Sequence, residues 1–178
     1  MNRIHFRTRH RLLVAALATA LLTACGPSEN ASRSLVAVEI DANTTCSLDG
    51  MLLADYPGPK AQIHYGDRPE PDFFCDTVEM FGLYFKPEQV RPVKGMFVQD
   101  MGKADWNQPR GAWIDAKTAW YVVGSRRHGS MGPTIASFAQ QADADKFAAE
   151  HGGKTVHFDA MTADMAILDG GALHDSKM

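Results

Sequence analysis

The sequence lacks the short motifs that identify most enzymes. It contains no Gly-x-Ser-x-Gly, no glycine-rich phosphate loop and no His-Glu-x-x-His, which excludes the common nucleophile-elbow, P-loop and zinc-protease chemistries. It has three cysteines and no Cys-x-x-Cys pair, so a four-ligand zinc site of the usual spacing is excluded as well. The acidic residues are scattered, with no pair that indicates general acid and base catalysis. We therefore expect that the chain is not an enzyme.

No hydrophobic run of the sequence is long enough to cross a membrane. The apolar run 12–22 follows an N-terminus with four arginines and no acid, which is typical of a secretory signal. The next residues, Leu22-Thr23-Ala24-Cys25, resemble a bacterial lipobox. We expect residues 1–24 to be the signal peptide, Cys25 to be lipidated, and the chain to be anchored to the bacterial membrane, facing the periplasm. By resemblance to bacterial sorting rules, Gly26 in place of an aspartate favours the outer membrane over the inner.

Basic residues are in the minority once the signal is removed. The signal contains four arginines and no acidic residue. Its removal leaves 14 of the 18 basic residues and all 21 acidic ones, which gives a formal charge of −7. No surplus of positive charge remains for phosphate groups, which excludes nucleic acid as a partner. Removal of the 24-residue signal leaves 154 of the 178 residues, enough for one domain or two small ones.

Apolar segments and turns predict the order strand-strand-helix-strand twice. Residues 25–43 are expected to be the lipid anchor and a flexible tether, and residues 161–178 a tail. The first unit, 44–108, is predicted to have strands at 51–54, 61–65 and 93–99 and a helix ending near Phe85. The second, 109–160, is predicted to have strands at 113–115, 119–123 and 155–158 and a helix at 142–151. Because each unit is small, we expect an α+β fold in which the tandem ββαβ units pack as a two-lobed body.

Methionine is abundant in the mature chain, which keeps eight of the nine methionines. Met80 and Met96 lie among apolar residues and are expected in the core, since methionine fills irregular gaps well. Met51, Met101 and Met131 lie at the edges of predicted loops. A methionine there has no core to fill, so these three are candidate metal ligands.

Cys46 and Met51 share the predicted turn T-C-S-L-D-G-M. We expect a metal site made of Cys46, Met51 and a further donor, either His64 or Met101. Thiolate and thioether donors together select soft ions, which for a periplasmic protein favours Cu(I) over Zn(II), Mg(II) or Ca(II).

Three further residues are weaker candidates for metal binding or transfer. His128 lies close to Met131 in R-R-H-G-S-M-G and forms a second candidate pair with it. Cys75 is open to three interpretations, as a ligand, as a transfer residue or as a packed side chain. Two cysteines in an oxidising compartment usually form a disulfide, so a structural lipoprotein with a Cys46–Cys75 bridge is one alternative. A thiol enzyme, with either cysteine acting beside His64, is another.

Several strings between residues 46 and 158 resemble the NosL family, the accessory lipoproteins of nitrous-oxide reductase in denitrifying bacteria. They are T-C-S-L-D-G-M, P-G-P-K-A-Q-I-H, F-F-C-D-T-V-E-M-F, V-Q-D-M-G, W-I-D-A-K-T-A-W-Y-V-V-G-S and S-M-G. The resemblance implies two tandem ββαβ units with a topology similar to that of the organomercurial lyase MerB. It also implies a Cu(I) chaperone for assembly of the copper-sulfide centre of nitrous-oxide reductase. The implied partners are the reductase and its ABC-type maturation complex with a periplasmic solenoid subunit.

One motif departs from the family pattern. Many members carry Cys-x-Met, whereas here Met51 follows Cys46 by five positions, and both side chains reach one ion only if the loop curls. Met101 in Q-D-M-G matches its family string without a gap. The similarity to MerB adds the alternative of a MerB-like lyase, which would need a proton donor beside a reactive thiol pair.

Overall fold

The computed structural model describes residues 35–167 of the chain. The predicted signal peptide, the lipidation site at Cys25, the start of the tether and the end of the tail lie outside these residues. Among the residues described, no helix has the length and apolar character needed to cross a membrane.

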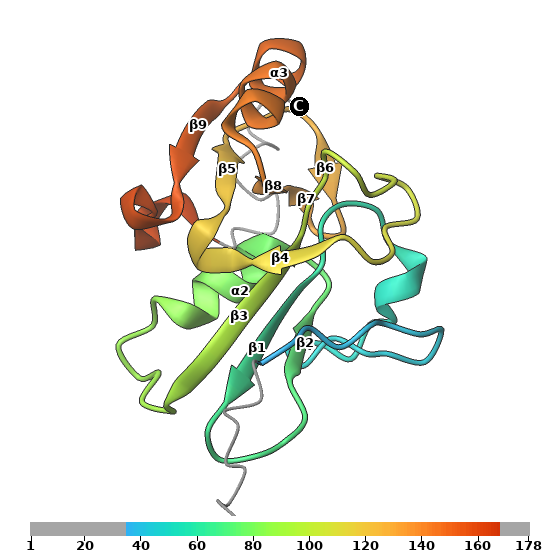
Figure 1. Ribbon diagram of the computed structural model, residues 1–178, viewed down its shortest axis with the longest axis vertical. Coiled ribbons are helices and arrows are strands. Elements are labelled where there is room, and N and C mark those ends of the chain that lie inside the picture. The colour runs from blue at the N-terminus through green and yellow to red at the C-terminus, as the bar shows by residue number, and fades with distance from the viewer. Residues whose placement is uncertain (1–34, 168–178) are drawn as a thin grey trace, which may run out of the picture. The chain divides into compact units, whose positions relative to one another are not determined.

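Two antiparallel sheets and two helices form the framework (Figure 1). The first sheet has the strand order β2-β1-β3-β4, with bounds Asp72–Phe74, Ala61–Tyr65, Val93–Gln99 and Trp113–Asp115. The second has the order β8-β5-β9, with bounds Ala136–Phe138, Trp120–Val123 and Lys154–His157. Helix α2 spans Thr77–Tyr84 and α3 spans Gln141–His151. The remaining elements are the hairpin of β6 (His128–Gly129) and β7 (Gly132–Pro133) and the 3-10 helices η1 (Leu53–Asp55), η2 (Ala116–Thr118), η3 (Phe158–Ala160) and η4 (Ala163–Met165).

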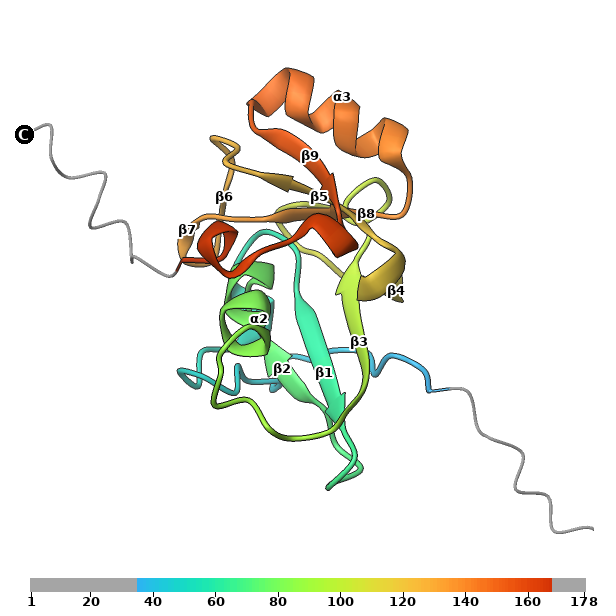
Figure 2. The same cartoon turned by 90° about the vertical axis from the view of Figure 1, so that its left-hand side faces the viewer.

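The tandem ββαβ arrangement is confirmed, and both units have the same strand order. In the first, β1, β2, α2 and β3 give the sheet order β2-β1-β3; in the second, β5, β8, α3 and β9 give β8-β5-β9. In each case the strand before the helix lies at one edge, and the strand after the helix pairs with the other side of the first strand. Figure 2 shows α3 along the outer face of the second sheet, with the first sheet and α2 below it.

The prediction of a strand at 51–54 is wrong. A bridge pairs Leu52 with Thr45, and the 3-10 helix η1 follows at once. A four-residue apolar run does not distinguish a strand from a helical turn. The second strand of the unit is instead β2, for which the sequence predicted no strand.

The second unit differs from the prediction in the same way. The segment 113–115 is a strand, β4, but it pairs with β3 of the first sheet. Its expected place is taken by β8, whose three residues are all buried, so the apolar-polar alternation that reveals a strand is missing.

Both sheets contribute to one main core. Its members include Ile63, Phe81 and Met96 from the first unit and Tyr121 and Val156 from the second. Met80 is in the same core and is fully buried, so the prediction that Met80 and Met96 fill the core is confirmed.

Segment 35–40 packs against the first sheet before the site loop begins. The backbone N–H of Val38 donates to Gln62 Oε1 at 2.8 Å, and Gln62 Nε2 donates to the carbonyl oxygen of Val38 at 2.9 Å. Ile40 then joins a small separate core with Cys46, Leu53 and Cys75. Residues 35–40 lie inside the predicted 25–43 tether, yet they are fixed against the fold and lead into the core that holds both cysteines.

We expect Phe81→Ala to lower the free energy of unfolding by about 3–5 kcal/mol. Phe81 is fully buried, and its ring contacts Tyr121, Phe85 and Phe158 at centroid distances of 4.9, 5.7 and 6.0 Å. The matched control is Val90→Ala, at a side chain 86% exposed, which should change the stability by no more than about 0.5 kcal/mol. Urea unfolding of the three proteins measures both values, and equal losses in the two variants would contradict this account of the core.

Candidate metal centre

The start of α2 fixes the first donor residues. Asp76 is the N-cap, and its Oδ1 accepts from the backbone N–H of Val78 at 3.0 Å. Glu79 completes a capping box, because its Oε2 accepts from the backbone N–H of Asp76 at 3.3 Å. This reciprocal bond turns the Glu79 side chain back toward Cys75, the residue before the cap.

A tight turn places Cys46 beside the same helix end. The backbone N–H of Cys46 donates to the carbonyl oxygen of Met51 at 2.8 Å, and that of Gly50 donates to the carbonyl oxygen of Cys46 at 2.9 Å. Gly50 has φ of +79°, a value that glycine adopts without strain. The turn is tied to β2 because Ser47 N–H donates to the carbonyl oxygen of Phe73 at 2.7 Å. Cys46 and Cys75 are thereby held close together.

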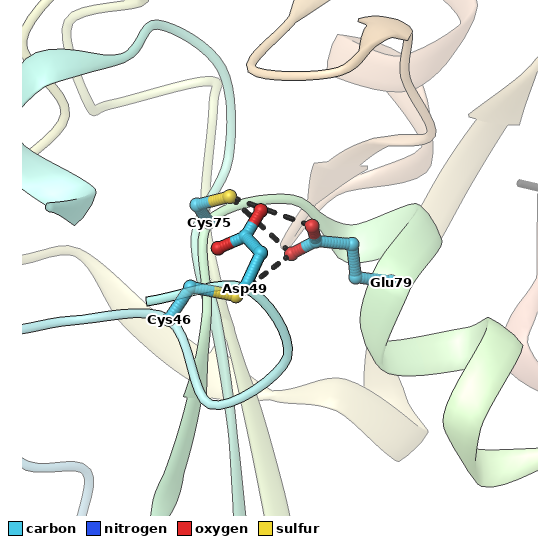
Figure 3. Close-up of side chains that lie close together, drawn as sticks. All are labelled: Cys46, Asp49, Cys75 and Glu79. Atoms are coloured by element: carbon cyan, nitrogen blue, oxygen red, sulfur yellow. Dashed lines mark hydrogen bonds between the residues drawn. The ribbon is translucent and has the colours of Figure 1, made fainter. Parts of the chain in front are cut away.

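Four donor side chains converge at this point, as Figure 3 shows. One metal-binding atom from each of Cys46, Asp49, Cys75 and Glu79 lies within 4.8 Å of all the others. Both cysteines are free thiols. Glu79 Oε2 accepts from Cys46 Sγ at 3.3 Å and from Cys75 Sγ at 3.4 Å. Cys46, Cys75 and Glu79 are buried, whereas Asp49 is exposed, so the cluster lies just below the surface and its exposed side is the turn.

The protonation of the cluster is set by its internal hydrogen bonds. A hydrogen bond from the Cys75 side chain lowers the pKa of Cys46 to about 6, and the same interaction together with burial raises the pKa of Cys75 above its ordinary value. Burial, followed by the negative charge of Cys46, raises the pKa of Glu79 to about 7. Near neutral pH, Cys46 and Glu79 therefore compete for a proton, and Cys46 is available as a thiolate.

A buried lysine lies under the cluster. Lys60 is fully buried, and its Nζ donates to the carbonyl oxygens of Pro57 at 2.9 Å and Cys75 at 3.0 Å. Burial lowers the pKa of Lys60 to about 8. The negative charges of Asp76, Cys75 and Glu79 act in the opposite direction and raise it, but burial has the larger effect. Burial also raises the pKa of Asp76 to about 6.

The donor set suits a soft cation with some tolerance for a harder one. Two sulfur atoms favour Cu(I), while carboxylate oxygens are ligands for harder ions. Met51 is a candidate thioether donor, because it is partly buried and packs against the small core that contains Cys46 and Cys75. The turn does curl as the Cys46–Met51 spacing requires, since the two residues are joined by a backbone hydrogen bond.

The β6–β7 hairpin reaches the cluster from the second unit. Ser130, at its tip, donates from Oγ to the carbonyl oxygen of Cys75 at 2.9 Å. Met131 follows and is 40% exposed, so it is free to turn toward an ion. His128 is exposed at the start of the hairpin, and its carbonyl oxygen accepts from the Trp106 indole N–H at 3.1 Å.

Two of the predicted candidates have other partners. His64 is 5% exposed, its Nε2 is hydrogen-bonded to Gln62 Oε1 at 2.9 Å, and its ring meets Phe97 edge-on. Burial lowers the pKa of His64. Met101 packs against the core of the second unit. The group of four donors does not include His64, and the roles of His64 and Met101 as ligands stay predictions.

Sequence reasoning missed Asp49 and Glu79, because it found no pairing among the scattered acids. Glu79 had a usable signal in C-D-T-V-E, where a glutamate three residues after a capping aspartate indicates a capping box. Asp49 follows Cys46 by three positions in a turn and had no comparable signal.

We expect Glu79→Gln to gain stability relative to the parent protein as pH rises. Because burial raises the pKa of Glu79 from 4.5 to about 7, the folded state binds more protons than the unfolded state between these values, and stability falls as pH rises through them. Glutamine cannot ionise and retains the capping box. Urea unfolding at about pH 5 and about pH 8 tests the difference. Glu70→Gln, at an exposed site, is the control, and an equal change in both variants would contradict the assignment.

Comparison with known proteins gives one consistent answer. The model of the NosL family matches residues 37–166. The copper-binding lipoprotein NosL of Stutzerimonas stutzeri is 37% identical over 180 residues, covering 98% of this chain and 93% of the relative. That of Achromobacter cycloclastes is 38% identical over 165 residues, covering 90% and 84%. The crystal structure of the copper chaperone NosL from Shewanella denitrificans has a TM-score of 0.70 and 38% identity, covering 72% of this chain and 97% of that one. The chain therefore belongs to the NosL family.

Proposed function

We propose that this chain is a periplasm-facing lipoprotein that binds Cu(I) and delivers it for assembly of the copper-sulfide centre of nitrous-oxide reductase. The observation that carries the proposal is the pair of free thiols, Cys46 and Cys75, with sulfur atoms within 4.8 Å. Cu(I) is the biological cation that such a sulfur pair suits best in a periplasmic protein. The printed names of the relatives, a copper-binding lipoprotein and a copper chaperone, support the same cargo.

The site also suits release of the cargo. Cys75 and Glu79 are held by the helix cap, but Cys46 lies at the start of a turn whose residues 47–50 are exposed. Once the turn opens, an acceptor can approach from that side and replace one sulfur at a time. Met51 and Met131, on the two segments beside the thiols, are candidates for holding the ion during exchange.

The proposed partners and location follow from the same function. A lipid at Cys25 would hold the copper site near the membrane and raise its concentration close to membrane-bound partners, with the outer membrane favoured. The ABC-type maturation complex, through its periplasmic solenoid subunit, and the reductase itself are the proposed recipients.

A thiol enzyme remains a second candidate because of one observation. A MerB-like lyase needs a proton donor beside a thiol pair, and Glu79, with a pKa raised by burial to about 7, touches both thiols. Release of a hydrocarbon from an organomercurial by the purified chain would favour this candidate, whereas stable mercury binding without release favours the chaperone.

We expect the reduced chain to bind one Cu(I), and Cys46→Ser and Cys75→Ser each to weaken binding at least about tenfold, or about 1.4 kcal/mol. A serine oxygen is a much poorer donor for Cu(I) than a thiolate. Competition with a Cu(I) chelator measures the affinities. Met96→Leu is the matched control, because Met96 is a buried core methionine and its loss should leave affinity unchanged. Unchanged affinity in Cys46→Ser would remove the proposed site.

Deletion of the gene should leave nitrous-oxide reductase folded but short of copper, with activity partly restored by excess copper. A Cys46→Ala strain should behave like the deletion, since it lacks a copper ligand. A Cys25→Ala strain should be milder or mislocalised, because the lipid concentrates the site but does not bind copper. Nitrous oxide accumulation and reductase copper content measure these effects. Normal copper loading in the deletion strain at limiting copper would rule out the function.

A further inference from the structure

The two cysteines are placed to react with each other as well as with a metal ion. Cys46 Sγ and Cys75 Sγ both contact a single oxygen atom, Glu79 Oε2, at 3.3 and 3.4 Å. Their mutual distance of at most 4.8 Å is within about 3 Å of the length of a disulfide bond. The backbones beside them are already joined through Ser47 and Phe73, so a small side-chain movement closes the gap.

We propose that Cys46 and Cys75 form a reversible dithiol–disulfide couple that reduces Cu(II) and thereby closes the copper site. The proposal rests on the Cu(I) chaperone function given above and adds an activity to it. Cu(I) is carried as cargo, whereas Cu(II) is reduced at the same site.

The donor set supports entry of both oxidation states. Cu(II) accepts oxygen ligands more readily than Cu(I) does, and the site has two carboxylates, Asp49 and Glu79, beside the sulfurs. Asp49 is exposed and Glu79 is buried, so an incoming ion meets oxygen donors from the surface down to the thiols.

The electrons and protons of the step balance. Each thiol sulfur loses one electron and one proton, the two sulfurs join, and two Cu(II) ions become two Cu(I) ions. Glu79 accepts one proton at a time, because its carboxylate already accepts a hydrogen bond from each thiol, and it passes each proton on to solvent at the exposed turn. The overall reaction converts two thiols and two Cu(II) into one disulfide, two Cu(I) and two protons.

Burial of the two sulfur atoms limits which oxidants can reach them. Cys46 is 3% exposed and Cys75 is 0% exposed, so the active site of a disulfide-forming protein cannot contact either sulfur while the turn is closed. A metal ion is small enough to enter. After oxidation no thiolate remains to bind Cu(I), and reopening the site requires a dithiol reductant that attacks the disulfide after the 46–51 turn has opened.

The test uses the full chain carrying Cys25→Ser, which leaves Cys46 and Cys75 as its two cysteines. The reduced protein is titrated with Cu(II) under argon, with bathocuproine disulfonate reporting Cu(I) and a thiol reagent counting free sulfurs under denaturing conditions. We expect two Cu(I) and loss of two thiols per chain, with a monomeric product that regains both thiols on treatment with dithiothreitol. The isolated oxidised form should bind Cu(I) at least about tenfold more weakly than the reduced form.

The control is Cys46→Ser in the same background, which retains one thiol and should give at most half the Cu(I) and no intramolecular bridge. The proposal is overturned if the two-cysteine chain yields no more Cu(I) than this control, if its product is a disulfide-linked dimer, or if the oxidised form binds Cu(I) as tightly as the reduced form. The chaperone function is judged separately by the affinity of the reduced protein for Cu(I). Failure there would not affect the yield of Cu(I) from Cu(II) or the thiol count.

Discussion

The carboxylate of Glu79 lies where the start of α2 meets both thiols, and the site depends on it. One oxygen caps the backbone N–H of Asp76 and also accepts from Cys46 and Cys75. A helix cap is a rigid anchor because its partners are backbone groups. The two cysteines, which are 29 residues apart in the chain, are therefore held against one fixed group. Helix stability and donor geometry have the same origin in this protein.

Negative charge accumulates around that carboxylate with limited compensation. Asp76 and Glu79 are both buried, and burial raises the pKa of each. Lys60, fully buried and bonded to the carbonyl oxygen of Cys75, is the ammonium that faces them. A buried charge is stable only when it is paired. A metal cation bound between thiolates would complete the pairing, which is a physical reason for this cluster to favour a bound ion over an empty state at neutral pH.

The two ββαβ units have the same topology, but only in the first is the second strand followed by a cysteine. The residues that follow β2 are Cys75 and the capping Asp76, whereas those that follow β8 are Ala139 and Gln140, and α3 has no side-chain cap. The sequence predicted the repeated order and most elements, including β3 at its observed bounds. In both units, however, it placed the two strands one segment too early. Very short buried strands such as β2 and β8 have too few residues to show the alternation on which such a prediction depends.

By itself the sequence predicted a lipid-anchored protein with soft-metal chemistry and Cys46 as a candidate ligand, because signal segments and sulfur content are properties of composition and order. Only the tertiary structure decided which donors meet. Cys75 and Glu79 come to Cys46 through the cap of α2 and the hydrogen bonds between the 46–51 turn and β2, while His64 is bonded to Gln62. The sequence shows which side chains are available as metal donors. Convergence of donors from a turn and a helix 30 residues apart depends on strand pairing and capping, which are long-range contacts that no local pattern contains.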